Sequence, residues 1–152
     1  MLTRRSFLTA TAATPLALGL AGPALAAEPP VFAPGGIAIN GYDPIGYFDA
    51  AAPVRGDAAQ ALDWNGATWH FADAANRDRF AADPAAFAPQ YGGYCAYAVS
   101  RGYTASTDPD AWTVHDGRLY LNFSRVVRAI WARDIPGNIA RGDENWPGVL
   151  SA

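Results

Sequence analysis

The chain has 152 residues, 51% of them hydrophobic, with five Trp, seven Tyr and seven Phe, so it can form a core and is not expected to be disordered. Eleven arginines and no lysines accompany fourteen acids, which gives a net charge of −3 without a basic stripe and argues against nucleic-acid or anionic-membrane binding. A single cysteine, Cys95, excludes an intramolecular disulfide framework.

The first 26 residues have the pattern of a twin-arginine signal peptide. Arg4 and Arg5 precede an uncharged stretch rich in Ala and Leu over residues 9–20, and Ala24-Leu25-Ala26 is typical of a cleavage site. The stretch is short for a membrane span, which needs about 20 strongly apolar residues, so an uncut N-terminal anchor helix is the less favoured alternative. We therefore predict a periplasmic protein with no stable membrane span after cleavage. Its nine remaining bases and fourteen acids would give a net charge of −5.

The rest of the chain is predicted to form one domain behind a short leader. Residues 27–37 are rich in proline and glycine and are expected to be flexible, whereas residues 38–152 have the size of a single domain. Two β-hairpins are predicted, each around a preferred two-residue turn: residues 60–71 around Asn65-Gly66, and residues 112–123 around Asp116-Gly117.

The two turns also predict which residues face each other across each hairpin. The expected pairs are Trp64 with Ala67 and Leu62 with Trp69 in the first hairpin, and Val114 with Leu119 and Trp112 with Leu121 in the second. These residues give each hairpin an apolar face. His70 lies on the polar face of the first hairpin, and His115 lies on that of the second.

Each hairpin is expected to lead into a capped helix. Asp73 can cap a helix that ends at Ala82, and Ser124 can cap one that ends at Arg133. Both caps lie seven residues after the turn glycine, so the chain contains two hairpin–helix units.

Two more helical segments are expected. A short helix is predicted within residues 94–100, after Gly92-Gly93, and a last irregular helical stretch is predicted to include Ile139 and Trp146. Together these elements predict an α+β fold, a small single domain of two β-hairpin–helix units in which short helices pack on antiparallel strands.

Several motifs follow one another in a specific order along most of this domain. They are Gly41-Tyr42-Asp43-Pro44-Ile45-Gly46-Tyr47-Phe48, Trp64-Asn65-Gly66-Ala67-Thr68-Trp69-His70-Phe71, Asp83-Pro84-Ala85-Ala86-Phe87, Pro89-Gln90-Tyr91-Gly92-Gly93-Tyr94-Cys95-Ala96 and Asp116-Gly117-Arg118-Leu119-Tyr120-Leu121-Asn122. With these motifs the chain resembles the YHS domain family and, more closely, its exported, stand-alone branch. Many YHS domains are associated with metal handling, including copper, so the resemblance implies such a role.

The chain departs from the metal-associated members of that family at their cysteines. Those members carry one cysteine soon after the Asp-Pro pair and two more after the aromatic strand, where this chain has Gly46, Ala72 and either Ala75 or Asn76. A site for a soft metal needs several converging sulfur or imidazole ligands. The candidate metal ligands that remain are Cys95, His70 and His115, and copper or zinc is the metal that such a set would bind.

Cys95 follows Gly92-Gly93 near the start of the predicted short helix. At such a place unpaired backbone N–H groups and the helix dipole would lower the pKa of the thiol, which would make it a reactive thiol or a soft metal ligand. The favoured interpretation is a small buried hydrophobic residue, because a free cysteine is often simply buried. Asp43, which precedes Pro44, is expected to be a turn residue.

Three functions of different classes fit the sequence. The preferred one is an exported binding module for a metal or for a small ligand in an aromatic pocket. The second is a thiol-dependent redox protein that uses Cys95, and the third is an accessory domain that binds a periplasmic protein partner. No hydrolase elbow, phosphate loop or Rossmann glycine pattern occurs, so nothing in the sequence argues for an enzyme. The aromatic residues expected to form core or pocket lining are Tyr42, Tyr47, Trp64, Trp69, Tyr91 and Tyr94.

Overall fold

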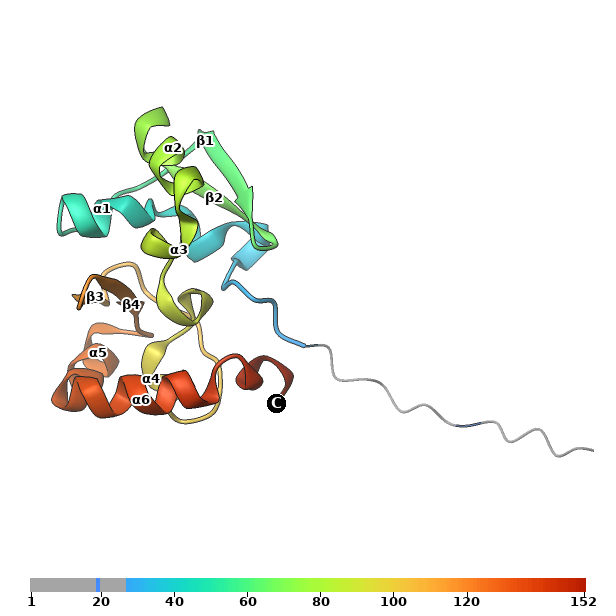
Figure 1. The fold of residues 1–152 in the computed structure, drawn as a ribbon, viewed down its shortest axis with the longest axis vertical. Coiled ribbons are helices and arrows are strands. Elements are labelled where there is room, and N and C mark those ends of the chain that lie inside the picture. Colours follow the sequence, from blue (N-terminus) through green and yellow to red (C-terminus); the bar gives the residue numbers. More distant parts are fainter. Residues whose placement is uncertain (1–18, 20–26) are drawn as a thin grey trace, which may run out of the picture.

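The structure, a computed structural model, describes residue 19 and residues 27–152. It is an α+β domain with two separate two-stranded antiparallel sheets and short helices, as predicted (Figure 1). The predicted export signal, residues 1–26, lies outside the described residues except for Gly19. No helix in the described part of the chain is long and apolar enough to cross a membrane.

The elements follow one another in short pieces. The strands are β1 (Asp57–Trp64), β2 (Ala67–Phe71), β3 (Trp112–His115) and β4 (Arg118–Leu121). The α-helices are α1 (Pro44–Asp49), α2 (Ala74–Ala82), α3 (Pro84–Phe87), α4 (Ala96–Ser100), α5 (Arg125–Trp131) and α6 (Ile135–Asn145). Single 3₁₀ turns lie at Pro34–Gly36, Ala38–Gly41, Gln90–Gly93, Ala132–Asp134 and Gly148–Ser151.

Both predicted hairpins have the predicted registers. Leu62 faces Trp69 across β1 and β2, and Trp112 faces Leu121 across β3 and β4. In each turn both central residues have positive φ, 51° and 79° in the first hairpin and 49° and 72° in the second. This is the backbone of a type I′ turn, which matches the twist of the strands and explains the Asn-Gly and Asp-Gly sequences.

The predicted helix caps are also confirmed. The Asp73 carboxylate accepts a hydrogen bond from the Asn76 N–H at the start of α2, and the Ser124 hydroxyl accepts one from the Val127 N–H at the start of α5. Helix α2 ends at Ala82 as predicted, whereas α5 ends two residues earlier than predicted and continues as a 3₁₀ turn. Both side chains satisfy N–H groups that have no partner inside their helix.

The two hairpin–helix units repeat a longer pattern than the sequence analysis predicted. The first unit covers residues 38–82 and the second covers residues 90–131. Each begins with three consecutive residues of left-handed backbone, with φ of 42°, 59° and 79° at residues 39–41 and of 57°, 62° and 85° at residues 91–93. A short helix, a hairpin and a capped helix then follow in the same order (Figure 1).

Backbone hydrogen bonds show which residues of the two units are equivalent. Asp43 and Cys95 each lie two residues after the left-handed turn and directly before the short helix. The N–H of Asp43 donates to the carbonyl oxygen of Val54 at 2.8 Å, and the N–H of Cys95 donates to that of Ala105 at 3.0 Å. Asp43 and Cys95 therefore occupy the same position in the two units.

The core consists of two hydrophobic clusters. The first combines Trp69, Phe71 and Phe80 of the first unit with Leu119 and Leu121 of the second, all of them at most 1% exposed. The second cluster lies between β4, the stretch from Tyr91 to α4 that precedes it, and the helical segments that follow it. One face of β4 thus packs on the first unit and the other packs on its own helices, which joins the two units into one body.

The segment predicted as a flexible leader is packed against the domain. Val31 is 2% exposed and belongs to the first core cluster. The N–H of Phe32 donates to the carbonyl oxygen of Gly92 at 2.9 Å, in the left-handed turn of the second unit. We call residues 28–33 the strap. Its proline content predicts an extended segment, but an extended segment can still bury an apolar side chain and pair its free N–H groups.

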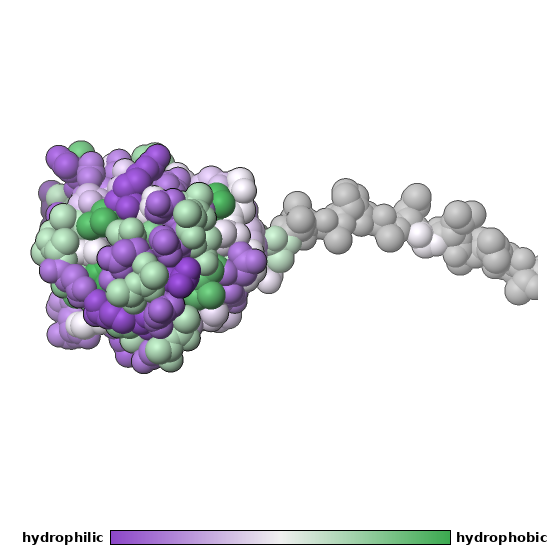
Figure 2. Space-filling view, turned by 90° about the horizontal axis from the view of Figure 1, so that it is seen from above, coloured by the Kyte–Doolittle hydropathy of each residue, from purple (hydrophilic) through white to green (hydrophobic). Residues whose placement is uncertain are grey.

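The first half of the domain is the more acidic one. Residues 27–89 contain eight of the fourteen acids and three arginines, whereas residues 90–152 contain six acids and six arginines. Figure 2 views the domain from above, from the side of α2 and β1 in Figure 1, and shows hydrophilic residues over most of this face with separate hydrophobic patches. The net negative charge of the domain therefore comes from its first half.

Candidate functional site

The three predicted metal ligands lie in three separate places. His70 is on β2 beside Arg55, and His115 is at the end of β3, where its Nε2 lies 3.4 Å from Asp116 Oδ2. Cys95 is 1% exposed and lies in the interior. From residue 27 onward, no group of three or more His, Cys, Asp and Glu side chains is placed to hold a metal ion. The predicted ligands do not come together because the two hairpins form separate sheets and the thiol is turned inward.

The Cys95 thiol is shifted in the direction opposite to the predicted one. Burial raises its pKa, and the backbone N–H groups of Ala98, Phe123 and Tyr97 lower it by less. Helix α4 has only five residues, so its dipole is small. Cys95 is therefore buried, as favoured from the sequence, and the alternative of an activated thiolate is not supported, because the thiol has lost the solvent that a thiolate needs.

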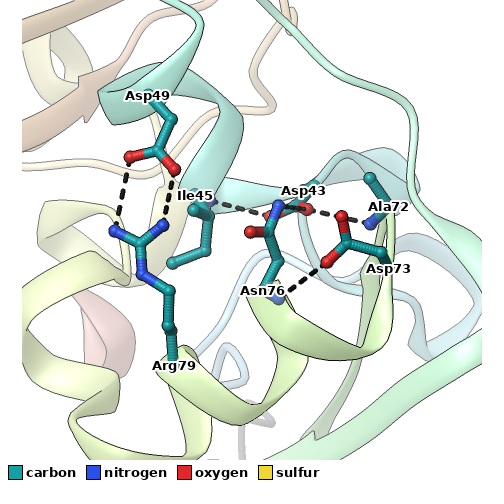
Figure 3. A network of polar contacts seen from close by, with 7 residues as sticks. All are labelled: Asp43, Ile45, Asp49, Ala72, Asp73, Asn76 and Arg79. Carbon is teal, nitrogen blue, oxygen red and sulfur yellow. Dashed lines mark hydrogen bonds and ion pairs between the residues drawn. The ribbon is translucent and has the colours of Figure 1, made fainter.

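Asp43 is a buried centre of polar contacts rather than only a turn residue. Its side chain is 0% exposed and accepts three hydrogen bonds of 2.8 Å, from the N–H of Ile45, the N–H of Ala72 and Nδ2 of Asn76 (Figure 3). These donors belong to the start of α1, the end of β2 and helix α2. One carboxylate thus ties together three segments of the first unit, whereas the sequence predicted only a turn residue before Pro44.

A second contact joins the same two helices at the surface. The guanidinium of Arg79, on α2, donates two hydrogen bonds to the carboxylate of Asp49, on α1 (Figure 3). Hydrogen bonding from Arg79 lowers the pKa of the Asp49 carboxyl. Both side chains are about half exposed, so the contact orients the helices more than it stabilises them.

In the second unit, two residues share the role of Asp43. The N–H of Phe123 donates to Cys95 Sγ at 3.3 Å, just as the N–H of Ala72 donates to Asp43. The N–H of Tyr97, in the first turn of α4, donates instead to Oδ1 of Asn122 at 3.0 Å. The thiol itself donates a hydrogen bond to this oxygen, with Sγ 3.5 Å away. The cap of α4 is thus supplied by Asn122, and the contact with Phe123 accounts for the position of the single cysteine without any reaction.

A hollow walled by aromatic residues lies where four chain segments meet, and we call it the aromatic hollow. The segments are the strap, the turn of the first hairpin, the stretch from α3 to Gly92 and the end of the chain after α6. Its volume is about 390 Å³. It is lined by Pro30, Val31, Trp64, Asn65, Trp69, Ala85, Ala88, Pro89, Gln90, Tyr91, Gly92, Trp146, Pro147 and Leu150.

The aromatic walls come in two pairs. Trp64 and Trp69 have ring centroids 5.8 Å apart, and Tyr91 and Trp146 have ring centroids 6.0 Å apart. Trp64, Trp69 and Tyr91 are among the residues that the sequence analysis predicted as core or pocket lining. Trp146 is not, because a tryptophan just after a helix end carries no local sign of what it will face.

Gly92 lines the aromatic hollow and lets the backbone there pack closely against the strap. Its φ is +62°, and a Cβ at this position would overlap the carbonyl oxygen of Pro30 and lie 3.3 Å from the Trp146 ring. The preceding Tyr91 has φ of 57° and is held by its hydroxyl, which donates to Asp143 Oδ1 at 2.9 Å. Strain of this kind needs support from its surroundings, which the strap and α6 supply.

The comparisons with known proteins add nothing to this geometry. Family models, curated proteins and solved structures contain no match to this chain. The aromatic hollow is the candidate functional site on its own chemistry: a hollow lined mostly by aromatic and aliphatic residues, with two side-chain amides, those of Asn65 and Gln90, along its lining.

Proposed function

We propose that the protein is an exported, YHS-like binding module that takes a small ligand with a flat apolar face into the aromatic hollow. The observation that carries the proposal is the set of indole and phenol rings around a space of about 390 Å³, a volume within the usual range for small-molecule sites. The twin-arginine pattern of residues 1–26 supports delivery to the periplasm, and the motifs from Gly41 onward support the family.

The residues of the aromatic hollow favour a compact aromatic ligand. Trp64 and Trp146 are only partly buried, so their ring faces remain available for stacking, which contributes about 0.5–1.5 kcal/mol for each ring pair. The amides of Asn65 and Gln90 can orient a hydroxyl or carbonyl on the ligand. None of the described residues that line the hollow is charged, so a neutral ligand fits better than an ion.

The metal alternative has less support, because Cys95, His70 and His115 do not converge. The redox alternative has less support as well, because burial raises the pKa of the Cys95 thiol. A partner-binding role is favoured by one observation: Phe123 and Val126, which lie one turn apart at the start of α5, are 54% and 70% exposed.

A titration followed by tryptophan fluorescence and ligand-observed NMR tests the proposal, with indole and 1-naphthol as probes. We expect saturable binding that Trp146→Ala weakens at least about tenfold, because one stacking wall is lost. Tyr103→Ala is the matched control, since Tyr103 is 53% exposed and does not line the aromatic hollow. Absence of binding, or equal binding by both variants, would contradict the proposal.

Two further measurements separate the alternatives. Titration with Cu(I) and Zn(II) supports the metal version only if stoichiometric binding is lost in Cys95→Ala or His70→Ala. Capture of one periplasmic partner that Phe123→Ser abolishes, with no binding of either probe, would favour the accessory role.

A further inference from the structure

A second hollow lies beside His70, and we call it the basic hollow. Its volume is about 610 Å³, and it is lined by Pro34, Ile37, Asn40, Gly41, Arg55, Gly56, Ala58 and His70. None of these residues is acidic, and none of them lines the aromatic hollow. Arg55 and His70 are the charged or titratable side chains among them, which makes this hollow chemically distinct from the first.

Among the residues that the structure describes, Arg55 lacks the carboxylate partner that the other two arginines of the first half have. In residues 27–89 acids outnumber arginines by eight to three, and the other two arginines both pair with carboxylates, Arg77 with Asp78 and Arg79 with Asp49. Within the described residues, the guanidinium of Arg55 has no ion pair and no side-chain hydrogen bond. An arginine left without a carboxylate in an acid-rich half of the domain is available to an external anion.

The position of the Arg55 guanidinium is nevertheless defined. Its central carbon lies 5.3 Å from the centroid of the Tyr42 ring, and the two residues are neighbours in an antiparallel bridge. Contact with the ring uses one face of the planar group and leaves the N–H groups along its edge free to donate. A guanidinium held in this way can form the two parallel hydrogen bonds that a carboxylate or phosphate accepts.

Two glycines, Gly41 and Gly56, let neighbouring segments pack closely against His70. A Cβ at Gly41, where φ is +79°, would lie 3.4 Å from Nδ1 of His70, and a Cβ at Gly56 would come within 2.6 Å of the His70 backbone and Cβ. The N–H of Gly56 donates to the carbonyl oxygen of Gly41 at 2.9 Å, which holds the two segments together. A side chain at Gly56 would overlap the backbone of β2, and one at Gly41 would lie against the imidazole and narrow the hollow there.

The second unit shows that the fold does not require this opening. Leu121 is the fourth residue after its turn glycine, as His70 is in the first unit, and Leu121 is 1% exposed in the core. Thr107 corresponds to Gly56, and its hydroxyl donates to the carbonyl oxygen of Gly93 at 2.8 Å. The second unit thus has a buried leucine and a threonine at the positions where the first unit has His70 and Gly56, beside Arg55.

We propose that the basic hollow binds a small oxyanion, a carboxylate or phosphate group, held by the Arg55 guanidinium with His70 as a second donor. The ligand would place its anionic oxygens against the guanidinium edge and fill the space above Gly41. This inference does not rest on the aromatic hollow, because the two sets of lining residues do not overlap.

An NMR titration of the purified protein tests this inference, with inorganic phosphate and acetate as separate probes at constant ionic strength. We expect saturable shifts of the His70 imidazole signals. Arg55→Gln should weaken binding at least about tenfold, because a charge-assisted, two-point contact is lost. Arg133→Gln, which removes an exposed arginine of the second half, should leave binding unchanged. The probe that binds more tightly identifies the carboxylate or the phosphate source.

A second variant, Ala58→Glu, tests whether Arg55→Gln weakens binding only by disturbing the local structure. Ala58 is exposed and lines the basic hollow, so Ala58→Glu should supply a carboxylate partner for Arg55 and abolish anion binding with Arg55 still present. Absence of saturation by either probe at about 10 mM, where a useful site would be filled, overturns the inference. So does equal weakening by Arg55→Gln and Arg133→Gln, which would show only general charge attraction.

Discussion

The two units of the domain satisfy the same backbone donors with different side chains. In the first unit the buried carboxylate of Asp43 accepts hydrogen bonds from the helix start and from the residue after the hairpin. In the second unit the thiol of Cys95 and the amide of Asn122 divide these two donors between them. In the sequence Cys95 stands out as a possible reactive group, but in the fold it is the counterpart of Asp43.

The second unit, where Cys95 and Asn122 take the place of one aspartate, has more buried side-chain groups without a hydrogen-bond partner. Within the described residues, the buried side-chain groups that lack a hydrogen-bond partner are Asn122 Nδ2 and Trp131 Nε1, and both belong to the second unit. Hydrogen bonds to a charged acceptor contribute about 1.5–3 kcal/mol each, more than those to a neutral sulfur, and an unpaired buried donor costs about 1–3 kcal/mol. We therefore expect the polar centre of the first unit to stabilise the domain more than that of the second.

The largest expected effect comes from Asp43→Ala. This change leaves the N–H groups of Ile45 and Ala72 and the amide of Asn76 without their acceptor, and we expect it to lower the free energy of unfolding by about 3–5 kcal/mol. Urea denaturation measures the change. Asp73→Ala is the control, because it removes an exposed helix cap and should lower the free energy of unfolding by only about 1 kcal/mol. Similar losses for both variants would contradict the central role of Asp43.

The left-handed turns give a second way to test the comparison. Asn40, with φ of 59°, has the place in the first turn that Gly92 has in the second. Asparagine tolerates this backbone, so Gly92→Asn would be mild if the turn alone mattered. Because a Cβ at Gly92 would overlap the Pro30 carbonyl oxygen, we expect this variant to displace the strap and lower the free energy of unfolding by about 2–4 kcal/mol.

The matched control for this experiment is Gly117→Asn. Gly117 also has positive φ, 72°, but a Cβ there meets nothing within 4 Å. We expect a change of less than about 1 kcal/mol, measured by the same urea denaturation. If both asparagine variants are equally stable, the strap does not hold the turn of the second unit.

The sequence predicts the hairpins and caps well because their signals are local. Asn65-Gly66 and Asp116-Gly117 specify type I′ turns within two residues, and the turns then determine the strand pairs. Asp73 and Ser124 cap the helices that begin beside them. Each of these predictions needs only residues that are close together in the chain.

The features that the sequence did not predict depend on distant contacts. Positive φ at Ile39 and Tyr91 contradicts the local preference of branched and aromatic residues, and tertiary packing overrides that preference. The packing of Val31 and the convergence of Trp64 with Trp146 join segments far apart in the chain. The pKa of Cys95 was expected to fall from its place near a helix start, whereas burial, which the local pattern does not reveal, raises it.

Apart from the controls, the smallest expected effect comes from Cys95→Ser. The serine hydroxyl can still accept from the Phe123 N–H, so we expect the free energy of unfolding to fall by only about 1 kcal/mol near neutral pH. Because burial raises the pKa of the native thiol above its ordinary value of 9.0, the native thiol stabilises the fold fully below pH 9.0 and loses this contribution as the pH rises further. The difference between the two proteins should therefore shrink in alkaline solution, where the buried tyrosines affect both alike. Urea denaturation across this range measures the difference, and iodoacetamide should alkylate the native thiol far more slowly than the unfolded one. Rapid alkylation of the folded protein would show a reactive thiol and would end the analogy between Cys95 and Asp43.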